Sequence, residues 1–149
     1  MDLFHSAAFG IYAIFATALC LLLMSIDGIG GAFRAGSKTT PNPEDVSTTS
    51  KGAKVVELDP DGVARVMRAH RNALANVIPF LIVTLLYVAL GATSQWILLL
   101  CAVFTAARVL HAIVYIRGVQ PWRTLAFVVG QACTVIAAVQ VVRAALVFA

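Results

Sequence analysis

The sequence predicts an all-α membrane protein built as a bundle of four transmembrane helices. Hydrophobic residues make up 60% of the 149 residues and charged residues only 12%, which is about half the charged fraction of an average soluble domain. The apolar residues gather in four long runs that carry almost no charge, and each run is long enough to cross a bilayer as a helix. We therefore expect one domain over residues 1–149, with helices at about 4–33, 60–91, 94–117 and 121–147.

The first helix starts from an apolar run between Phe4 and Ile26. The run has spanning length, and the N-terminal sequence MDLFHS contains no Lys or Arg. A cleaved signal peptide would carry a basic start, a shorter apolar core and a cleavage site of small residues. The first helix is therefore predicted to be a retained transmembrane helix.

A polar loop is expected at about residues 34–59. Ser, Thr and Lys dominate it, and Pro41 and Pro43 exclude a regular helix. The second helix follows, with Asp59 as its predicted N-cap and Pro60 in its first turn. Pro79 within this helix is predicted to kink it.

The last two helices are bounded by short turns. Thr93 or Ser94 can cap the third helix, and Trp96 lies where an interfacial aromatic residue is typical. Gly118 and Pro121 mark the next turn, because Gly commonly follows a helix end and Pro commonly starts a helix.

Lys and Arg are distributed unevenly among the loops, which predicts the orientation. The N-terminus and the second loop carry none. The first loop and its adjoining helix ends carry Arg34, Lys38, Lys51, Lys54, Arg65, Arg68 and Arg71, and the third turn carries Arg117 and Arg123. Positively charged loops stay in the cytoplasm. We expect the first and third loops there and both termini outside, and the Ala-, Val- and Leu-rich helices favour a bacterial inner membrane.

Composition also excludes other classes of function. The net charge of +4 is modest and lies in loops, so nucleic-acid binding is not expected. Cys20, Cys101 and Cys133 lie inside apolar runs without the spacing of metal ligands. They are interpreted as small core residues, with neither a disulfide nor a metal site.

Polar residues of three helices are predicted to meet at one depth near the cytoplasmic side. They are Arg68, His70, Arg71 and Asn72 in the second helix, Arg108, His111 and Tyr115 in the third, and Arg123, Thr124 and Gln131 in the fourth. Taken alone, each arginine could be a snorkelling anchor, Arg108 an interhelical hydrogen-bond donor and His111 a core histidine. Together they favour a site for a small ligand with several negative charges, because guanidinium groups bind carboxylates through paired hydrogen bonds.

Arg123 and Thr124 suggest more than binding. A cation next to a hydroxyl at a helix N-terminus can stabilise a thiolate or an oxyanion. None of the three cysteines is placed to be that thiolate. The sulfur would therefore have to arrive with the ligand.

Several stretches resemble the family of membrane-associated proteins in eicosanoid and glutathione metabolism (MAPEG), and within it the microsomal prostaglandin E synthase type most of all. The stretches are NPED at 42–45, RAHRNALANVIPFL at 68–81, ARVLHAIVYIRG at 107–118 and PWRTLAFVVGQ at 121–131, together with Arg34. The resemblance implies a homotrimer that binds glutathione between subunits on the cytoplasmic side. It also implies that the glutathione thiol is activated toward a lipophilic substrate arriving from the bilayer.

The resemblance also assigns roles to residues. The glutathione site would comprise Arg34, Arg68, Arg71, Asn72, His111, Tyr115 and Arg123. Arg123 would lie beside the sulfur, and Thr124 would replace the serine proposed to activate the thiol. Asp45 would be an acid–base group or would organise an arginine. Gln131 and Phe127 would border the lipophilic substrate.

Two positions depart from the family pattern. Ala75 replaces a glutamate that would contact the glutathione amino group, and such a charge-assisted hydrogen bond is worth about 1.5–3 kcal/mol. Asn76, one residue further along the helix, is an imperfect substitute. Phe127 replaces a tyrosine near the thiol, so Arg123 and Thr124 remain the candidates for thiol activation.

The sequence thus predicts a glutathione-dependent membrane transferase, peroxidase or isomerase that acts on lipophilic electrophiles or lipid peroxides. Ala75 and Phe127 keep an alternative open, a non-catalytic lipid-binding member of the same family. A third interpretation is an unrelated function of the same fold, such as a small transporter or an enzyme that uses another thiol.

Overall fold

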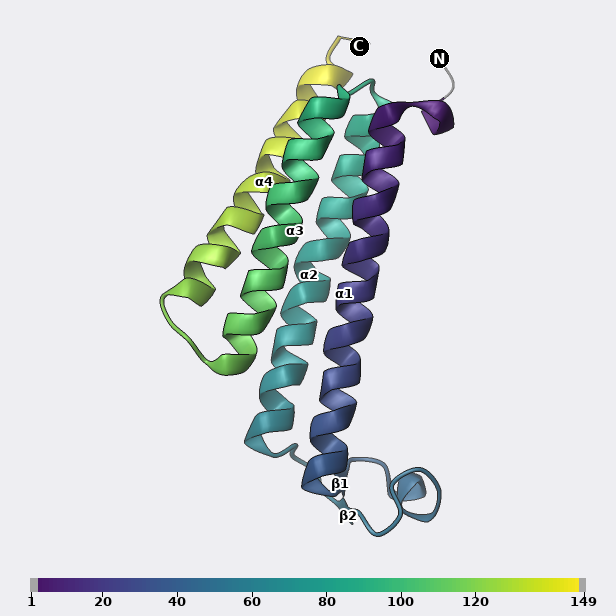
Figure 1. Cartoon of the computed structure of the whole chain (residues 1–149), viewed down its shortest axis with the longest axis vertical. Coiled ribbons are helices and arrows are strands. Elements are labelled where there is room, and N and C mark those ends of the chain that lie inside the picture. Colours follow the sequence, from purple (N-terminus) through teal and green to yellow (C-terminus); the bar gives the residue numbers. More distant parts are fainter. Residues whose placement is uncertain (1–2, 148–149) are drawn as a thin grey trace.

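The computed structural model describes residues 3–147 and consists of four long helices that run alternately in opposite directions (Figure 1). They are α1 (Ala7–Ser37), α2 (Asp61–Ala89), α3 (Ser94–Arg117) and α4 (Trp122–Ala145), and a short 3-10 helix, η1 (Leu3–His5), precedes α1. All four are long and apolar enough to cross a membrane. The predicted all-α bundle of four spanning helices is therefore confirmed.

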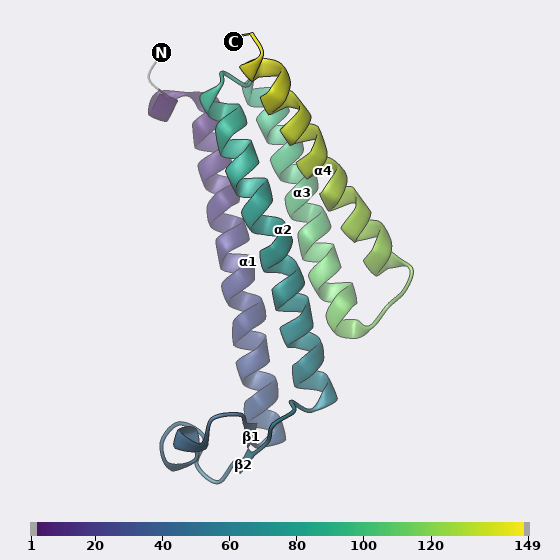
Figure 2. The same ribbon diagram turned by 180° about the vertical axis from the view of Figure 1, so that it is seen from behind.

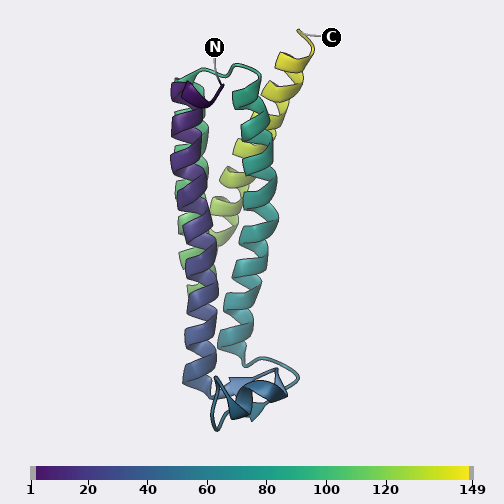
Figure 3. The same ribbon diagram turned by 90° about the vertical axis from the view of Figure 1, so that its right-hand side faces the viewer.

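Helix α1 lies further along the chain than predicted: it begins at Ala7 and ends at Ser37, against the predicted span of about 4–33. The hydroxyl of Ser6 caps its start by accepting a hydrogen bond from the backbone N–H of Phe9 at 3.1 Å. The helix then continues to Ser37, four residues past the expected end, and stops at Lys38, whose φ of 51° lies in the left-handed region. Helices α1 and α2 both extend beyond the turn between α3 and α4 (Figures 1 and 3).

The linker between α1 and α2, for which the sequence predicted only a polar loop without a regular helix, contains ordered structure. Strands β1 (Thr39–Thr40) and β2 (Lys54–Val55) pair in parallel, and the 3-10 helix η2 (Pro43–Ser47) lies between them in the sequence. The left-handed backbone of Lys38 allows its carbonyl to accept from the N–H of Lys54 at 2.9 Å. This bond helps to dock the linker against the end of α1.

Asp59 does not cap α2, so that prediction was wrong. The N-cap residue is Pro60, and the Asp59 carboxylate instead accepts two hydrogen bonds from Arg34, from Nε at 3.2 Å and from Nη2 at 2.8 Å. A paired, charge-assisted contact of this kind is stronger than the neutral bond that a cap provides. It ties the end of α1 to the start of α2.

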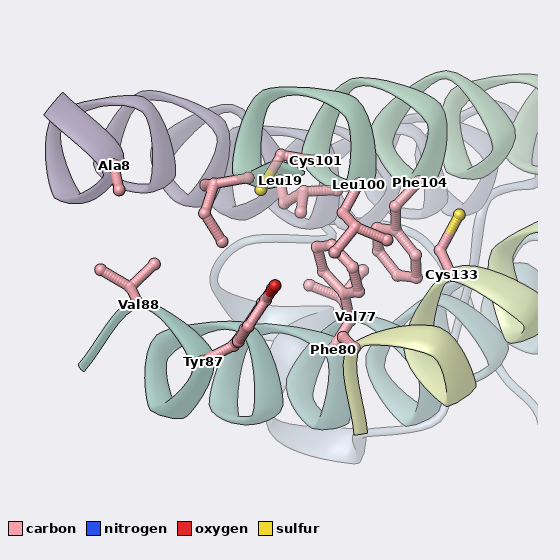
Figure 4. Close-up of a cluster of buried hydrophobic side chains, with 12 residues drawn as sticks. Ala8, Leu19, Val77, Phe80, Tyr87, Val88, Leu100, Cys101, Phe104 and Cys133 are labelled. Carbon is pink, nitrogen blue, oxygen red and sulfur yellow. The ribbon is translucent and has the colours of Figure 1, made fainter. Parts of the chain in front are cut away.

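The helices pack around an apolar core made of two clusters of buried side chains. Helix α1 packs on α2 and α3, and α4 packs on the same two helices (Figure 2). In the core the rings of Phe80 and Phe104 stack, with their centroids 3.7 Å apart (Figure 4). Cys101 and Cys133 are buried free thiols in this core, as predicted, but Cys20 is exposed on α1. Its position in an apolar run did not show which face of the helix it occupies.

Candidate functional site

A pocket of about 210 Å³ opens beside the turn between α3 and α4. Its lining residues are Asn72 from α2, His111 and Tyr115 from α3, and Arg123, Thr124 and Phe127 from α4. All six were singled out from the sequence, and the structure brings them together. None of the six is acidic, and they offer guanidinium, amide, imidazole and hydroxyl groups. This set of donors suits an anionic ligand.

Helix geometry explains how α3 and α4 build most of the pocket. His111 and Tyr115 are four residues apart and lie on one face, with ring centroids 5.4 Å apart. Gly118, at φ 72°, ends α3 in a left-handed conformation, as the sequence predicted. The chain then reverses, and Arg123 and Thr124 fall in the first turn of α4. The guanidinium carbon of Arg123 lies 4.9 Å from the centre of the Tyr115 ring, a favourable cation–π contact.

Gln120 connects the two residues predicted to act on the thiol. We assign its amide with the oxygen toward Arg123, because this orientation satisfies both neighbours. The oxygen then accepts from Arg123 Nε at 3.0 Å and Nη2 at 2.6 Å, and the nitrogen donates to Thr124 Oγ1 at 3.1 Å. The Thr124 oxygen is thereby occupied as an acceptor. A hydroxyl group also carries one hydrogen, so Thr124 can donate a further hydrogen bond.

Sequence reasoning did not single out Gln120. The available signal was its spacing, because Arg123 and Thr124 follow it at i+3 and i+4. Residues at that spacing meet on a helix surface. Since Gln120 precedes Pro121 in what was interpreted as a turn, the spacing was not used.

Asn76 supports Asn72 and does not replace the missing glutamate. Its side chain is buried, and Nδ2 donates to the Asn72 carbonyl at 2.7 Å and lies 3.5 Å from Asn72 Oδ1. Ala75, by contrast, is exposed on the outer face of α2. The Asn76 amide is therefore directed into the bundle, away from the surface that Ala75 occupies.

Arg108 belongs to the core and does not line the pocket. It is 2% exposed, and its guanidinium carbon lies 5.6 Å from the Phe104 ring centre and 5.7 Å from that of Phe127. Nη2 donates to the carbonyls of Ala126 at 3.0 Å and Phe127 at 3.2 Å. Arg108 is therefore an interhelical donor, the structural alternative that the sequence left open.

Five residues that the family resemblance assigns to the site lie elsewhere in the single chain. Arg68 and Arg71 are exposed on α2, and Gln131 is exposed on α4. Arg34 pairs with Asp59. Asp45 accepts hydrogen bonds within the linker, from Thr40 at 3.1 Å and Asn42 at 3.2 Å. One copy of the chain thus assembles only part of the predicted site.

Comparison with known proteins assigns the chain to a family. The model of the MAPEG family matches residues 11–143. The chain belongs to the MAPEG family. It is 34% identical over 148 residues to microsomal glutathione S-transferase 1 of Sus scrofa, covering 97% of this chain and 96% of that protein.

Two further MAPEG relatives show the same range of similarity. Microsomal glutathione S-transferase 1 of Homo sapiens is 36% identical over 138 residues, covering 91% of this chain and 89% of that protein. Prostaglandin E synthase of Equus caballus is 30% identical over 132 residues, covering 88% of this chain and 85% of that protein. Membership of this membrane family, together with four spanning helices, makes the chain an integral, multi-pass membrane protein.

Proposed function

We propose that this MAPEG member is a glutathione-dependent enzyme that acts in the membrane on lipophilic electrophiles or lipid peroxides, as a transferase, peroxidase or isomerase. The observation that carries the proposal is the contact of Gln120 with both Arg123 and Thr124 at the edge of a pocket without acidic residues. The names of its relatives, glutathione S-transferase and prostaglandin E synthase, support the same class of chemistry.

The residues of the pocket fit the needs of thiol chemistry. Glutathione would supply a thiolate nucleophile. A guanidinium group near a thiol favours the charged form and lowers its pKa, and Arg123 is held for this role by Gln120 and Tyr115. Thr124 can donate its hydroxyl hydrogen to the sulfur. Asn72, His111 and Tyr115 supply further hydrogen-bonding groups for the peptide part of the ligand.

The size of the pocket supports a site shared between subunits. A volume of about 210 Å³ is below the roughly 300–1,000 Å³ of typical small-molecule sites. Arg68 and Arg71 face outward on α2, and Asp45 lies in the linker. We propose that a homotrimer brings these residues, with Arg34, to the ligand, and that Asp45 serves as an acid–base or arginine-organising group.

A lipophilic co-substrate has an apolar surface available near the same helix turn. A groove of about 360 Å³ runs between α3 and α4, and Trp122, Leu125 and Ala126 line it beside Ala107 and Leu110. The groove and the pocket thus share the first turns of α4. Phe127, which lines the pocket, and Gln131, one turn further on, remain the proposed substrate-binding residues.

We also infer that the linker and the turn at 118–121 are cytoplasmic. Both lie at the end of the bundle opposite the two termini (Figure 1), and Lys and Arg concentrate at this end. A bacterial inner membrane is the proposed host. A reporter enzyme that is active only outside the cytoplasm should therefore be active when it is fused to the C-terminus. An inactive fusion would contradict this orientation.

Titration calorimetry with glutathione tests the proposed function. We expect the detergent-solubilised protein to bind glutathione saturably at millimolar or better affinity, and the S-methyl form to bind without supporting turnover. Aromatic halides and lipid hydroperoxides would then be screened as co-substrates. A folded protein that binds lipid but neither binds glutathione nor turns over would favour the non-catalytic, lipid-binding alternative.

Replacing Ala75 with glutamate should tighten glutathione binding by about ten- to a hundredfold, because one charge-assisted hydrogen bond contributes about 1.5–3 kcal/mol. Ala75 is exposed on α2, so the longer side chain can be accommodated. Ala75→Gln is the matched control, since it has nearly the same shape without the charge, and it should give a smaller gain. Calorimetry measures both affinities. An unchanged affinity in Ala75→Glu would show that the surface around residue 75 does not contact bound glutathione.

Replacing Gln120 with alanine should lower activity by about tenfold or more, because Arg123 and Thr124 each lose a hydrogen-bond partner. The diagnostic measurement is the pH profile of the thiolate absorbance of bound glutathione, which should shift to higher pH. The control is Gln140→Ala, because Gln140 accepts from Arg143 at 3.4 Å near the other end of α4. A lower activity with an unmoved pH profile would contradict a positioning role for Gln120.

A further inference from the structure

Asp27 is a charged residue that the proposed function does not use. Among the described residues it is the only acidic side chain in the interior of one of the four long helices, since Asp61 is the first residue of α2. It is exposed on α1. Acidic residues within spanning helices are costly and usually have a partner, so Asp27 requires an explanation.

The apolar length of the helices places Asp27 at the membrane boundary nearest the linker. Roughly 20 residues of α1 precede it, a length of about 30 Å, which matches the hydrocarbon thickness. In α2 the uncharged stretch begins at Ala73, directly after Arg71 and Asn72. Asp27 and Arg71 therefore lie at the same boundary.

Packing between α1 and α2 independently places Asp27 at the same depth. Ile26, next to Asp27, belongs to one buried cluster with Val66 and Ala73. A Cβ atom added to Gly30, one turn further on, would collide with the end of the Met67 side chain. Asp27 is thus level with the part of α2 that carries Arg68 and Arg71.

These three charged side chains are exposed, and among the described residues of one copy they have no partner. Within residues 3–147, no ion pair or side-chain hydrogen bond involves Asp27, Arg68 or Arg71. Arg34, two turns after Asp27 on α1, by contrast pairs with Asp59. Opposite charges at one depth, all outward-facing, are complementary across an interface.

We infer that Asp27 of one copy forms an ion pair with Arg68 or Arg71 of a second copy. The contact joins α1 of one subunit to α2 of the next, so the two surfaces differ. Contacts of this kind generate closed rings when the rotation between copies closes. Because one carboxylate faces two guanidinium groups, one positive charge remains for an anionic ligand. The inference concerns assembly and holds whether or not the pocket binds glutathione.

Cross-linking between differently tagged chains tests the contact. The starting protein carries alanine at Cys20, Cys101 and Cys133, and Asp27→Cys in one tagged chain is co-expressed with Arg71→Cys, or Arg68→Cys, in the other. A short bis-maleimide should join the two tags in membranes, while Gly10→Cys, near the other end of α1, should give no product with either partner. Cross-linking only when both cysteines share a chain, or no cross-linking in any arrangement, would overturn the inference.

Charge reversal in the full-length protein with its native cysteines is the second test. Asp27→Arg should raise the dissociation constant of the assembly in mild detergent at least tenfold, measured by native mass spectrometry. Combining it with Arg71→Asp or Arg68→Asp should restore the assembly. The control is Glu44→Arg, which reverses an exposed acidic residue in the linker and should leave assembly unchanged. An intact assembly in Asp27→Arg would refute the contact, without bearing on glutathione binding.

Discussion

Replacing Arg123 with alanine should reduce glutathione-dependent turnover by about a hundredfold or more, the largest loss expected from any single change in the pocket. Arg123 is the guanidinium group that lies in the pocket, held by two hydrogen bonds to Gln120 and by the Tyr115 ring. Removing a preorganised group that stabilises developing negative charge typically costs about 10²–10³ in kcat. Steady-state kinetics and the pH dependence of the bound thiolate measure the effect.

Two variants serve as controls for the Arg123→Ala prediction. Arg143→Ala removes an exposed arginine near the other end of α4 and should leave turnover unchanged. Arg123→Lys keeps the charge but not the planar fork, so it should retain an intermediate activity. Unaltered thiol-transfer activity in Arg123→Ala would show that the thiol is activated elsewhere.

Replacing Gly130 with alanine should destabilise the protein by about 3 kcal/mol, through overpacking and through loss of the Arg108 hydrogen bonds. A Cβ atom at Gly130 would lie 2.5 Å from Arg108 Nη2, 2.8 Å from Nε and 2.9 Å from Cζ. Arg108 is buried between two aromatic rings and cannot move aside without losing the carbonyls of Ala126 and Phe127. Thermal unfolding followed by circular dichroism in detergent measures the change.

The structure supplies a matched control and a rescue for Gly130. Gly28 is also helical, and a Cβ atom added there would have nothing within 4 Å, so Gly28→Ala should be neutral or slightly stabilising. Combining Gly130→Ala with Arg108→Ala removes the collision, and the two effects should not add. Additive losses would mean that Gly130 matters for a reason other than the space it leaves for Arg108.

Features governed by neighbouring residues were predictable from the sequence. The four helices follow from the lengths of the apolar runs, and the end of α3 follows from Gly118, whose left-handed φ disfavours other residues. The pairing of His111 with Tyr115 follows from their spacing of four residues. The convergence of Asn72, His111 and Arg123 followed because antiparallel helices return their ends to one depth.

Features that depend on which face of a helix is covered were not predictable in this way. Cys20 was expected in the core and is exposed, because α1 packs mainly on α2 and α3 and leaves much of its surface uncovered. Asp59 was expected to cap α2 and instead pairs with Arg34, a partner 25 residues earlier in the chain. Both outcomes depend on the packing of one helix on another.

The sequence by itself determined that this is a four-helix membrane protein with a cationic cluster at one end, because hydropathy and helical spacing are local properties of the chain. Only the tertiary structure decided how the polar groups are used. It placed Arg108 in the core, directed Asn76 toward Asn72, joined Gln120 to Arg123 and Thr124, and left Asp27, Arg68 and Arg71 facing outward. The physical reason is that a polar side chain binds whichever partner the packed helices bring within hydrogen-bond distance, and that distance is set by contacts far apart in the sequence.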